Sequence, residues 1–105
     1  IWNAHVKEMT NLTEPDRVHF MNVVFAVESV LRELLNPDKI NLASLGNQTP
    51  HLHWHVIPRY RDDAHFPNPI WSVRLRELTQ NITVDTSLLS RRLAEQLTKG
   101  QGGQK

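Results

Sequence analysis

Residues 51–59 read His51-Leu52-His53-Trp54-His55-Val56-Ile57-Pro58-Arg59. Three of the six histidines of the chain stand at alternate positions of this stretch, with apolar residues between them. Because side chains on a β-strand alternate between two faces, the spacing predicts one face of imidazoles and an opposite face that packs. Neighbouring histidines would then lie roughly 6 to 7 Å apart along the backbone. The stretch therefore predicts both a strand and a place for chemistry.

A second strand is predicted immediately upstream. Residues 39–45 read as a strand, with Ile40 and Leu42 on one face and Asn41 and Ala43 on the other. Residues 46–50 read Gly-Asn-Gln-Thr-Pro, which is typical of a turn. A strand, a short polar loop and the histidine strand together predict an antiparallel hairpin.

A long helix is predicted before this hairpin. Thr13 is a suitable cap, Pro15 fits the first turn, and apolar residues repeat at helical spacing to about Leu35. Met21, Phe25 and Val30 widen the apolar stripe beyond what one sheet face needs. We therefore expect a second packing partner for this helix, such as another subunit.

The remainder of the chain is less regular. Residues 60–71 read as a loop, residues 72–84 fit either a strand or irregular structure, residues 86–99 predict a helix, and residues 101–105 predict disorder. We expect Arg59 and Arg61 to be solvated charges, and Trp54 and Trp71 to lie in the core or an interface rather than to stack on a base.

Composition limits the class of protein. The chain has 105 residues, which is enough for one domain, and its 39% apolar and 22% charged residues are typical of a globular protein. A net charge of +1 gives no reason to expect nucleic-acid binding. The absence of cysteine excludes disulfides, thiolate zinc sites and a cysteine nucleophile. Because no apolar run approaches membrane-spanning length, we expect a cytoplasmic protein without membrane contact.

The alternating histidines allow two chemical interpretations. Solvated histidines would place three like charges on one face when protonated, which repulsion disfavours. In the first interpretation, imidazoles bind a metal ion, with a further ligand from the set His5, His19, His65, Asp62 and Asp63. In the second, a histidine attacks phosphorus, because free histidine has a pKa of about 6.5 and is mostly neutral at pH 7. Flanking imidazoles would then stabilise phosphate oxygens and protonate the leaving group.

The residues that decide between these interpretations resemble a known family. His51-Leu52-His53-Trp54-His55-Val56-Ile57 is similar to the His-φ-His-φ-His-φ-φ signature of the histidine triad (HIT) superfamily of nucleotide hydrolases and transferases, where φ is an apolar residue. Pro58-Arg59 matches a frequent extension of that signature. Upstream, the segment from Asn3 to Leu12 resembles the entry to the long helix of the family. The resemblance covers roughly residues 1–71.

The resemblance implies an α+β fold, in which a long helix packs on an antiparallel sheet, and a homodimer. It implies that His53 attacks the α-phosphate of a nucleotide to form a nucleotidyl-histidine intermediate, which water or another acceptor resolves. It also implies that His51 orients His53 and that His55 contacts the phosphate or the leaving group. Further substrate-binding residues implied by the resemblance are His5, Asn41, Asn47, Gln48 and Thr49.

Three features depart from the family pattern, and the third is the tail after Trp71. The order Asn47-Gln48-Thr49-Pro50 differs from the usual Gln followed by Ser or Thr, so Gln48 either donates to the leaving group or is solvated. Family members also begin with strands that form much of the nucleoside pocket, and we expect such strands to precede Ile1. We therefore predict a HIT-like domain over residues 1–71 and a C-terminal helical extension over residues 72–105.

The resemblance thus implies a nucleotide hydrolase or transferase that acts on a phosphoramidate, a dinucleoside polyphosphate or a nucleotidyl ester. We expect the covalent step of such an enzyme to require no cofactor, although Mg²⁺ would accompany a polyphosphate substrate. The alternative is a nucleotide- or metal-binding module with little turnover.

Overall fold

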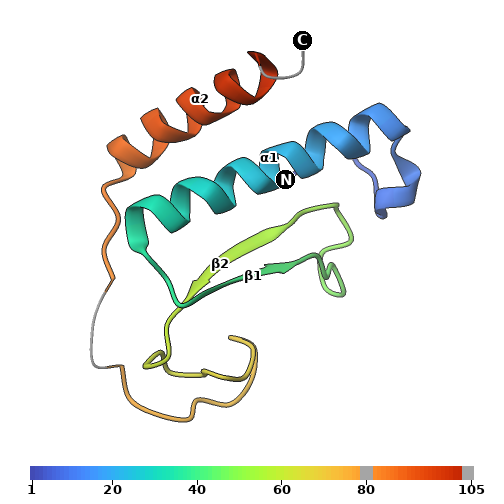
Figure 1. Ribbon diagram of the computed structural model, residues 1–105. Helices are drawn as coiled ribbons and strands as arrows, with labels where there is room; N and C mark the ends of the chain where they lie inside the picture. Colours follow the sequence, from blue (N-terminus) through green and yellow to red (C-terminus); the bar gives the residue numbers. More distant parts are fainter. Residues whose placement is uncertain (79–81, 103–105) are drawn as a thin grey trace.

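The computed structural model describes residues 1–78 and 82–102, which form an α+β fold of three layers. The elements in chain order are η1 (Met9–Asn11), α1 (Glu14–Leu35), β1 (Lys39–Ala43), β2 (His55–Arg59) and α2 (Thr86–Gly102). Helix α1 lies between the two-stranded sheet and helix α2 (Figure 1). The predicted fold class, with a long helix on an antiparallel sheet and a C-terminal helix, is confirmed. The predicted division into domains at residue 71 stays a prediction.

Helix α1 begins and ends as its sequence predicts. The Thr13 side chain accepts a hydrogen bond from the Asp16 amide, and proline stands in the first turn. Asn36 ends the helix in the left-handed conformation with φ 46°, and its amide donates to the Arg32 carbonyl. Asn tolerates this conformation better than most residues, so the chain can reverse toward β1.

The sheet is an antiparallel pair, and its register runs from Lys39 opposite Arg59 to Ala43 opposite His55. The hairpin prediction is therefore correct, but the pairing with β1 does not include residues 51–54. That half of the stretch pairs with the N-terminal segment instead, because the Trp2 amide donates to the Leu52 carbonyl and the Leu52 amide donates to the Val6 carbonyl.

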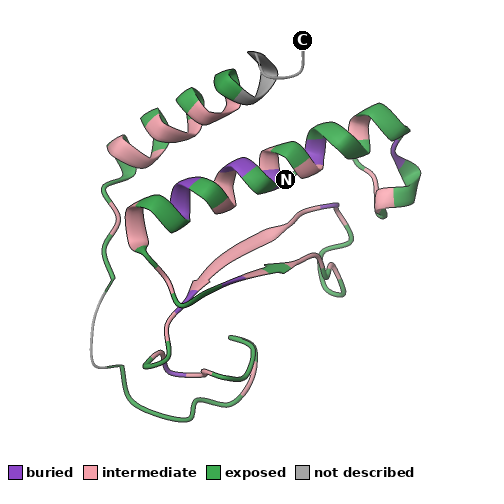
Figure 2. Cartoon of the chain, viewed as in Figure 1, coloured by how far each residue is buried: buried purple, intermediate pink, exposed green. Residues whose placement is uncertain are grey.

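The main core lies between α1 and residues 52–56. Its buried members are Leu12, Phe20, Val24 and Leu52, and partly buried apolar side chains surround them. Figure 2 shows that burial is concentrated along α1, whereas the loop after β2 is mostly exposed or intermediate. The core therefore fixes the backbone of the histidine stretch from its apolar side.

Helix α2 packs against α1, but Phe25 of the wide apolar stripe stays 50% exposed, so a second packing partner for that stripe stays a prediction. The Asp85 side chain accepts hydrogen bonds from the amides of Ser87 and Leu88 at the start of α2. Arg92 of α2 forms an ion pair of 2.7 Å with Glu33 of α1. The helix continues to Gly102, three residues beyond its predicted end. Residues 103–105, the rest of the end that was predicted to be disordered, lie outside the described part of the chain. Residues 79–81, within the segment 72–84 that fits either a strand or irregular structure, also lie outside it.

No helix in the described ranges, 1–78 and 82–102, is both long and apolar enough to cross a membrane.

Candidate active site

The histidine stretch presents two chemically different faces, as its alternation predicts. Leu52 is buried, and Trp54 and Val56 pack against the core cluster beneath α1. His51, His53 and His55 remain half-buried on the other side. The alternation thus extends over residues 51–54, although these residues are not paired with β1. Extended backbone alone is sufficient to separate the two faces.

His53 is held by the main chain of the residue two positions before it. Its Nδ1 lies 2.6 Å from the His51 carbonyl oxygen. A carbonyl oxygen can only accept a hydrogen bond, so Nδ1 must carry the proton. In a neutral imidazole the other nitrogen, Nε2, then has a free lone pair. This contact gives His53 the tautomer that a nucleophile requires.

The imidazole of His51 turns away from His53 toward the N-terminal segment. Its Nε2 lies 2.6 Å from the Trp2 carbonyl oxygen, so that nitrogen carries a proton. Its Nδ1 lies 3.1 Å from Nδ1 of His5, and these two nitrogens share one hydrogen bond. Trp2 is itself fixed, because its indole stacks on Phe20 of α1 with 5.3 Å between ring centroids. His5 and Trp2 together hold the His51 ring.

His55 lies between His53 and an aromatic side chain of the later loop. The ring centroids of His53 and His55 are 5.1 Å apart, and those of His55 and Trp71 are 5.3 Å apart. Both pairs are nearly perpendicular, at 82° and 77°. The three rings form a continuous row.

These rings border an open cleft of about 360 Å³. Its lining residues are Leu45, Gly46, Asn47, Gln48, Thr49, His53, His55 and Trp71. The cleft therefore has imidazoles on one side and a polar loop on another.

The loop over residues 45–49 depends on its glycine. Gly46 has φ +86°, a conformation that L side chains rarely adopt, and a Cβ there would lie 3.3 Å from the Thr49 carbonyl oxygen. The turn brings Asn47, Gln48 and Thr49 to the cleft. Polar donors thus surround the space beside His53.

Asn41 is not brought to this cleft. Its Oδ1 accepts a hydrogen bond of 2.7 Å from Arg59, which stands near the other end of the hairpin. Of the predicted substrate-binding residues, Asn47, Gln48 and Thr49 line the cleft and His5 contacts His51. Their roles in binding stay predictions.

Arg59 is buried rather than solvated, which corrects the expectation from sequence. Its side chain is 3% exposed and forms two hydrogen bonds with Asp63, of 2.8 and 3.1 Å. It also donates to the Asn68 carbonyl at 2.7 Å and lies 5.7 Å from the centroid of the Phe66 ring. The Arg59 hydrogen bonds hold the pKa of the Asp63 carboxyl far below its usual range. Arg59 therefore anchors the loop that carries Trp71.

Two residues of the site were not predicted from sequence. Ser44 donates a 2.7 Å hydrogen bond from Oγ to the His53 carbonyl oxygen and so fixes the backbone of His53. Ser44 lies inside the strand predicted over residues 39–45, whereas β1 ends one residue earlier at Ala43, so its sequence position gave no signal of this contact. Trp71 is 52% exposed and lines the cleft, so the expectation that it lies in the core is wrong, and its place in an interface stays a prediction.

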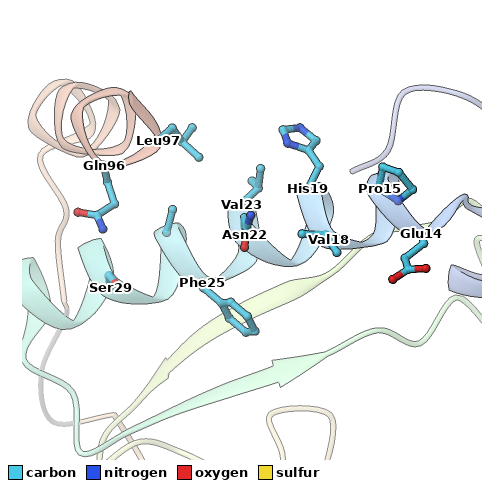
Figure 3. A pocket seen from close by; sticks show the side chains of 11 residues that line it. Glu14, Pro15, Val18, His19, Asn22, Val23, Phe25, Ser29, Gln96 and Leu97 are labelled. Atoms are coloured by element: carbon cyan, nitrogen blue, oxygen red, sulfur yellow. The ribbon is translucent and has the colours of Figure 1, made fainter. Parts of the chain in front are cut away.

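A larger hollow of about 680 Å³ lies between α1 and α2, away from the histidine stretch (Figure 3). Its lining is largely apolar and includes only one histidine, His19. Within the described residues, no group of three or more His, Cys, Asp or Glu side chains could hold a metal ion. The metal-binding interpretation therefore has no assembled ligand set in that part of the chain.

Comparison with known proteins agrees with this geometry. The profile of the HIT domain family matches residues 1–62, more than half of the chain. The chain therefore belongs to the HIT domain family. The fold and the alternating histidines are those of a histidine triad protein.

Solved structures of histidine triad proteins share the fold. One from Sinorhizobium meliloti 1021 is 28% identical with a TM-score of 0.68, over 90% of this chain and 68% of that one. One from Marinobacter aquaeolei VT8 is 26% identical with a TM-score of 0.68, over 92% and 69%. One from Bradyrhizobium japonicum is 29% identical with a TM-score of 0.64, over 92% and 68%. No curated protein matches the chain.

Proposed function

We propose that this chain is a nucleotide hydrolase or nucleotidyltransferase that acts at the α-phosphate of its substrate through a covalent intermediate on His53. The substrate would be a nucleoside phosphoramidate, a dinucleoside polyphosphate or a nucleotidyl ester. The observation that carries the proposal is the 2.6 Å contact of His53 Nδ1 with the His51 carbonyl oxygen. In the neutral imidazole this contact places the free lone pair on Nε2, and His53 lines an open cleft.

The proposed reaction has two steps. His53 Nε2 attacks phosphorus, a P–N bond forms, and the bond from phosphorus to the leaving group breaks. His55, whose ring is the neighbour of His53, enters this step as an imidazolium, gives one proton to the departing atom and becomes a neutral imidazole. Water or another acceptor then attacks phosphorus and gives its proton to the deprotonated His55, and the P–N bond breaks. Both histidines return to their starting states.

The polar loop at Asn47, Gln48 and Thr49 is the proposed binding surface for the non-bridging phosphate oxygens. Amide and hydroxyl groups can donate to the negative charge that builds up on these oxygens. Asn41 is left out of this surface, because Arg59 already occupies its carbonyl oxygen.

The proposed covalent step uses imidazole nitrogens and needs no metal ion. Mg²⁺ would accompany a polyphosphate substrate, where it neutralises phosphate charge. A homodimer is also part of the proposal. It is supported by Val18 and Phe25 on α1, which are 54% and 50% exposed and offer apolar surface to a second copy.

Turnover of adenosine 5′-phosphoramidate tests the proposal. His53→Ala should abolish release of AMP while the circular dichroism spectrum and the melting temperature stay unchanged, because the ring lies outside the core. His19→Ala is the matched control, since His19 is exposed and does not line the cleft. Wild-type protein that binds AMP tightly without turning over any of the three substrate classes would instead identify a binding module.

A further inference from the structure

Trp71 occupies a position for which the proposed reaction, as described above, has no role. It lies 16 residues after His55 in the sequence, yet their rings meet at 5.3 Å, and both line the cleft. Among the described residues that line this cleft, Trp71 is the one large aromatic side chain. An aromatic side chain in that place can change which substrates fit.

The position of Trp71 is well defined, because hydrogen bonds fix the loop on both sides of it. Arg59 holds the Asn68 carbonyl upstream at 2.7 Å. Directly after Trp71, Ser72 donates to the Pro69 carbonyl from both its amide, at 3.0 Å, and its Oγ, at 2.6 Å. Further along, Arg76 donates to the Phe66 carbonyl at 2.8 Å. Loops held in this way present a side chain with little further loss of entropy on binding.

The indole retains surface that a ligand could cover. Trp71 is 52% exposed, and its ring is nearly perpendicular to that of His55, so their contact uses only a small part of its surface. An exposed aromatic face gains free energy when a planar group stacks on it.

The order of the rings indicates which part of the substrate Trp71 would contact. His53 touches His55, and His55 touches Trp71. His53 is the proposed point of attack, and His55 is the proposed donor to the departing atom. A group attached to that atom therefore extends from His55 toward Trp71.

We propose that Trp71 is a specificity-determining residue that stacks on a planar leaving group, such as an aromatic amine or the second nucleobase of a dinucleoside polyphosphate. This inference rests on the proposed function, because it assigns the leaving-group side of the same cleft.

Three AMP phosphoramidates test the inference, with ammonia, cyclohexylamine or aniline as the leaving amine. The parameter to compare is kcat/KM of each variant relative to wild type, because the intrinsic reactivities of the amines cancel in that ratio. Trp71→Ala should lower kcat/KM for the anilide about tenfold more than for the ammonia compound, and Trp71→Phe should restore most of the difference. The cyclohexylamide, of similar size but not planar, should lose less than the anilide.

Val73→Ala is the control for general disturbance of the loop, because Val73 is 83% exposed and does not line the cleft. Val73→Ala should have the same kcat/KM as wild type for all three phosphoramidates. An equal loss for all three amides in Trp71→Ala would overturn the inference, since it would mean that Trp71 acts only by positioning His55. No loss for any amide would also overturn it. Absence of turnover by wild-type protein would overturn the proposed function and this inference together.

Discussion

The main-chain carbonyl of His51, rather than its imidazole, accepts the hydrogen bond from Nδ1 of His53, at 2.6 Å. A main-chain group two residues upstream thus orients the ring of His53, the proposed nucleophile. The His51 ring is directed elsewhere, toward Trp2 and His5. The two histidines should therefore respond differently to substitution.

His51→Ala should lower kcat/KM by only about tenfold, whereas His53→Ala should lower it by about a thousandfold or more. The reason is that alanine at position 51 still provides the carbonyl that fixes the tautomer of His53. Phosphoramidate hydrolysis by the two purified variants checks this prediction. Equal losses in the two variants would mean that the His51 imidazole takes part in the reaction directly.

Leu52→Ala should destabilise the fold by about 3 kcal/mol, because Leu52 is 4% exposed in the main core and its truncation leaves a cavity. It should also lower activity, since the same residue separates His51 from His53. Urea unfolding measures the loss of stability. Leu45→Ala is a suitable control for stability, because Leu45 is 57% exposed. Comparable destabilisation by the two variants would contradict the assignment of Leu52 to the core and of Leu45 to the surface.

Ser44→Ala should cost about 1 kcal/mol of stability, since it removes the 2.7 Å hydrogen bond to the His53 carbonyl. We also expect a lower kcat, because the backbone of His53, the proposed nucleophile, becomes less fixed. Ser90→Ala, at an exposed position of α2, is the matched control. Thermal unfolding and single-turnover kinetics provide the two measurements. An unchanged kcat would limit Ser44 to a structural role.

Asp63→Asn should destabilise the protein at neutral pH by about 3 kcal/mol, because it leaves the buried Arg59 guanidinium without its counter-ion. The pKa of Asp63 is lowered from 3.8 by the Arg59 hydrogen bonds. A lowered folded-state pKa adds stability that is complete above the ordinary value and is lost as pH falls toward the folded value. The difference in stability between wild type and Asp63→Asn should therefore be constant from pH 5 to 8 and narrow below about pH 4.

Measurement of the free energy of unfolding of both proteins as a function of pH checks the predicted narrowing below about pH 4. A difference that stays constant down to pH 2 would contradict the Arg59–Asp63 account.

Local sequence signals predicted much of the fold. Thr13 and Asn36 mark the ends of α1 because capping depends on residues adjacent in the sequence. The alternation of His51 and Leu52 predicted the two faces correctly, since it depends only on extended backbone. These features need no knowledge of distant contacts.

Other parts of the fold depend on contacts between residues far apart in the sequence, and these parts were not predicted. Trp2 and Val6 pair with Leu52 and so take residues 51–54 out of the ladder with β1. The burial of Arg59 depends on Asn41 and Asn68, which no local pattern connects to it. The contact of Trp71 with His55 depends on that same anchored loop. Sequence therefore predicted the face on which His53 lies better than it predicted the walls of the cleft.

Mapping of the covalent adduct tests the central claim most directly. The protein is incubated briefly with adenosine 5′-phosphoramidate, quenched, digested and sequenced by mass spectrometry, and the attachment nitrogen is identified by ³¹P and ¹⁵N NMR. The account predicts AMP on Nε2 of His53, because the other nitrogen donates to the His51 carbonyl. AMP on Nδ1 of His53, AMP on another histidine, or turnover without any adduct would contradict it.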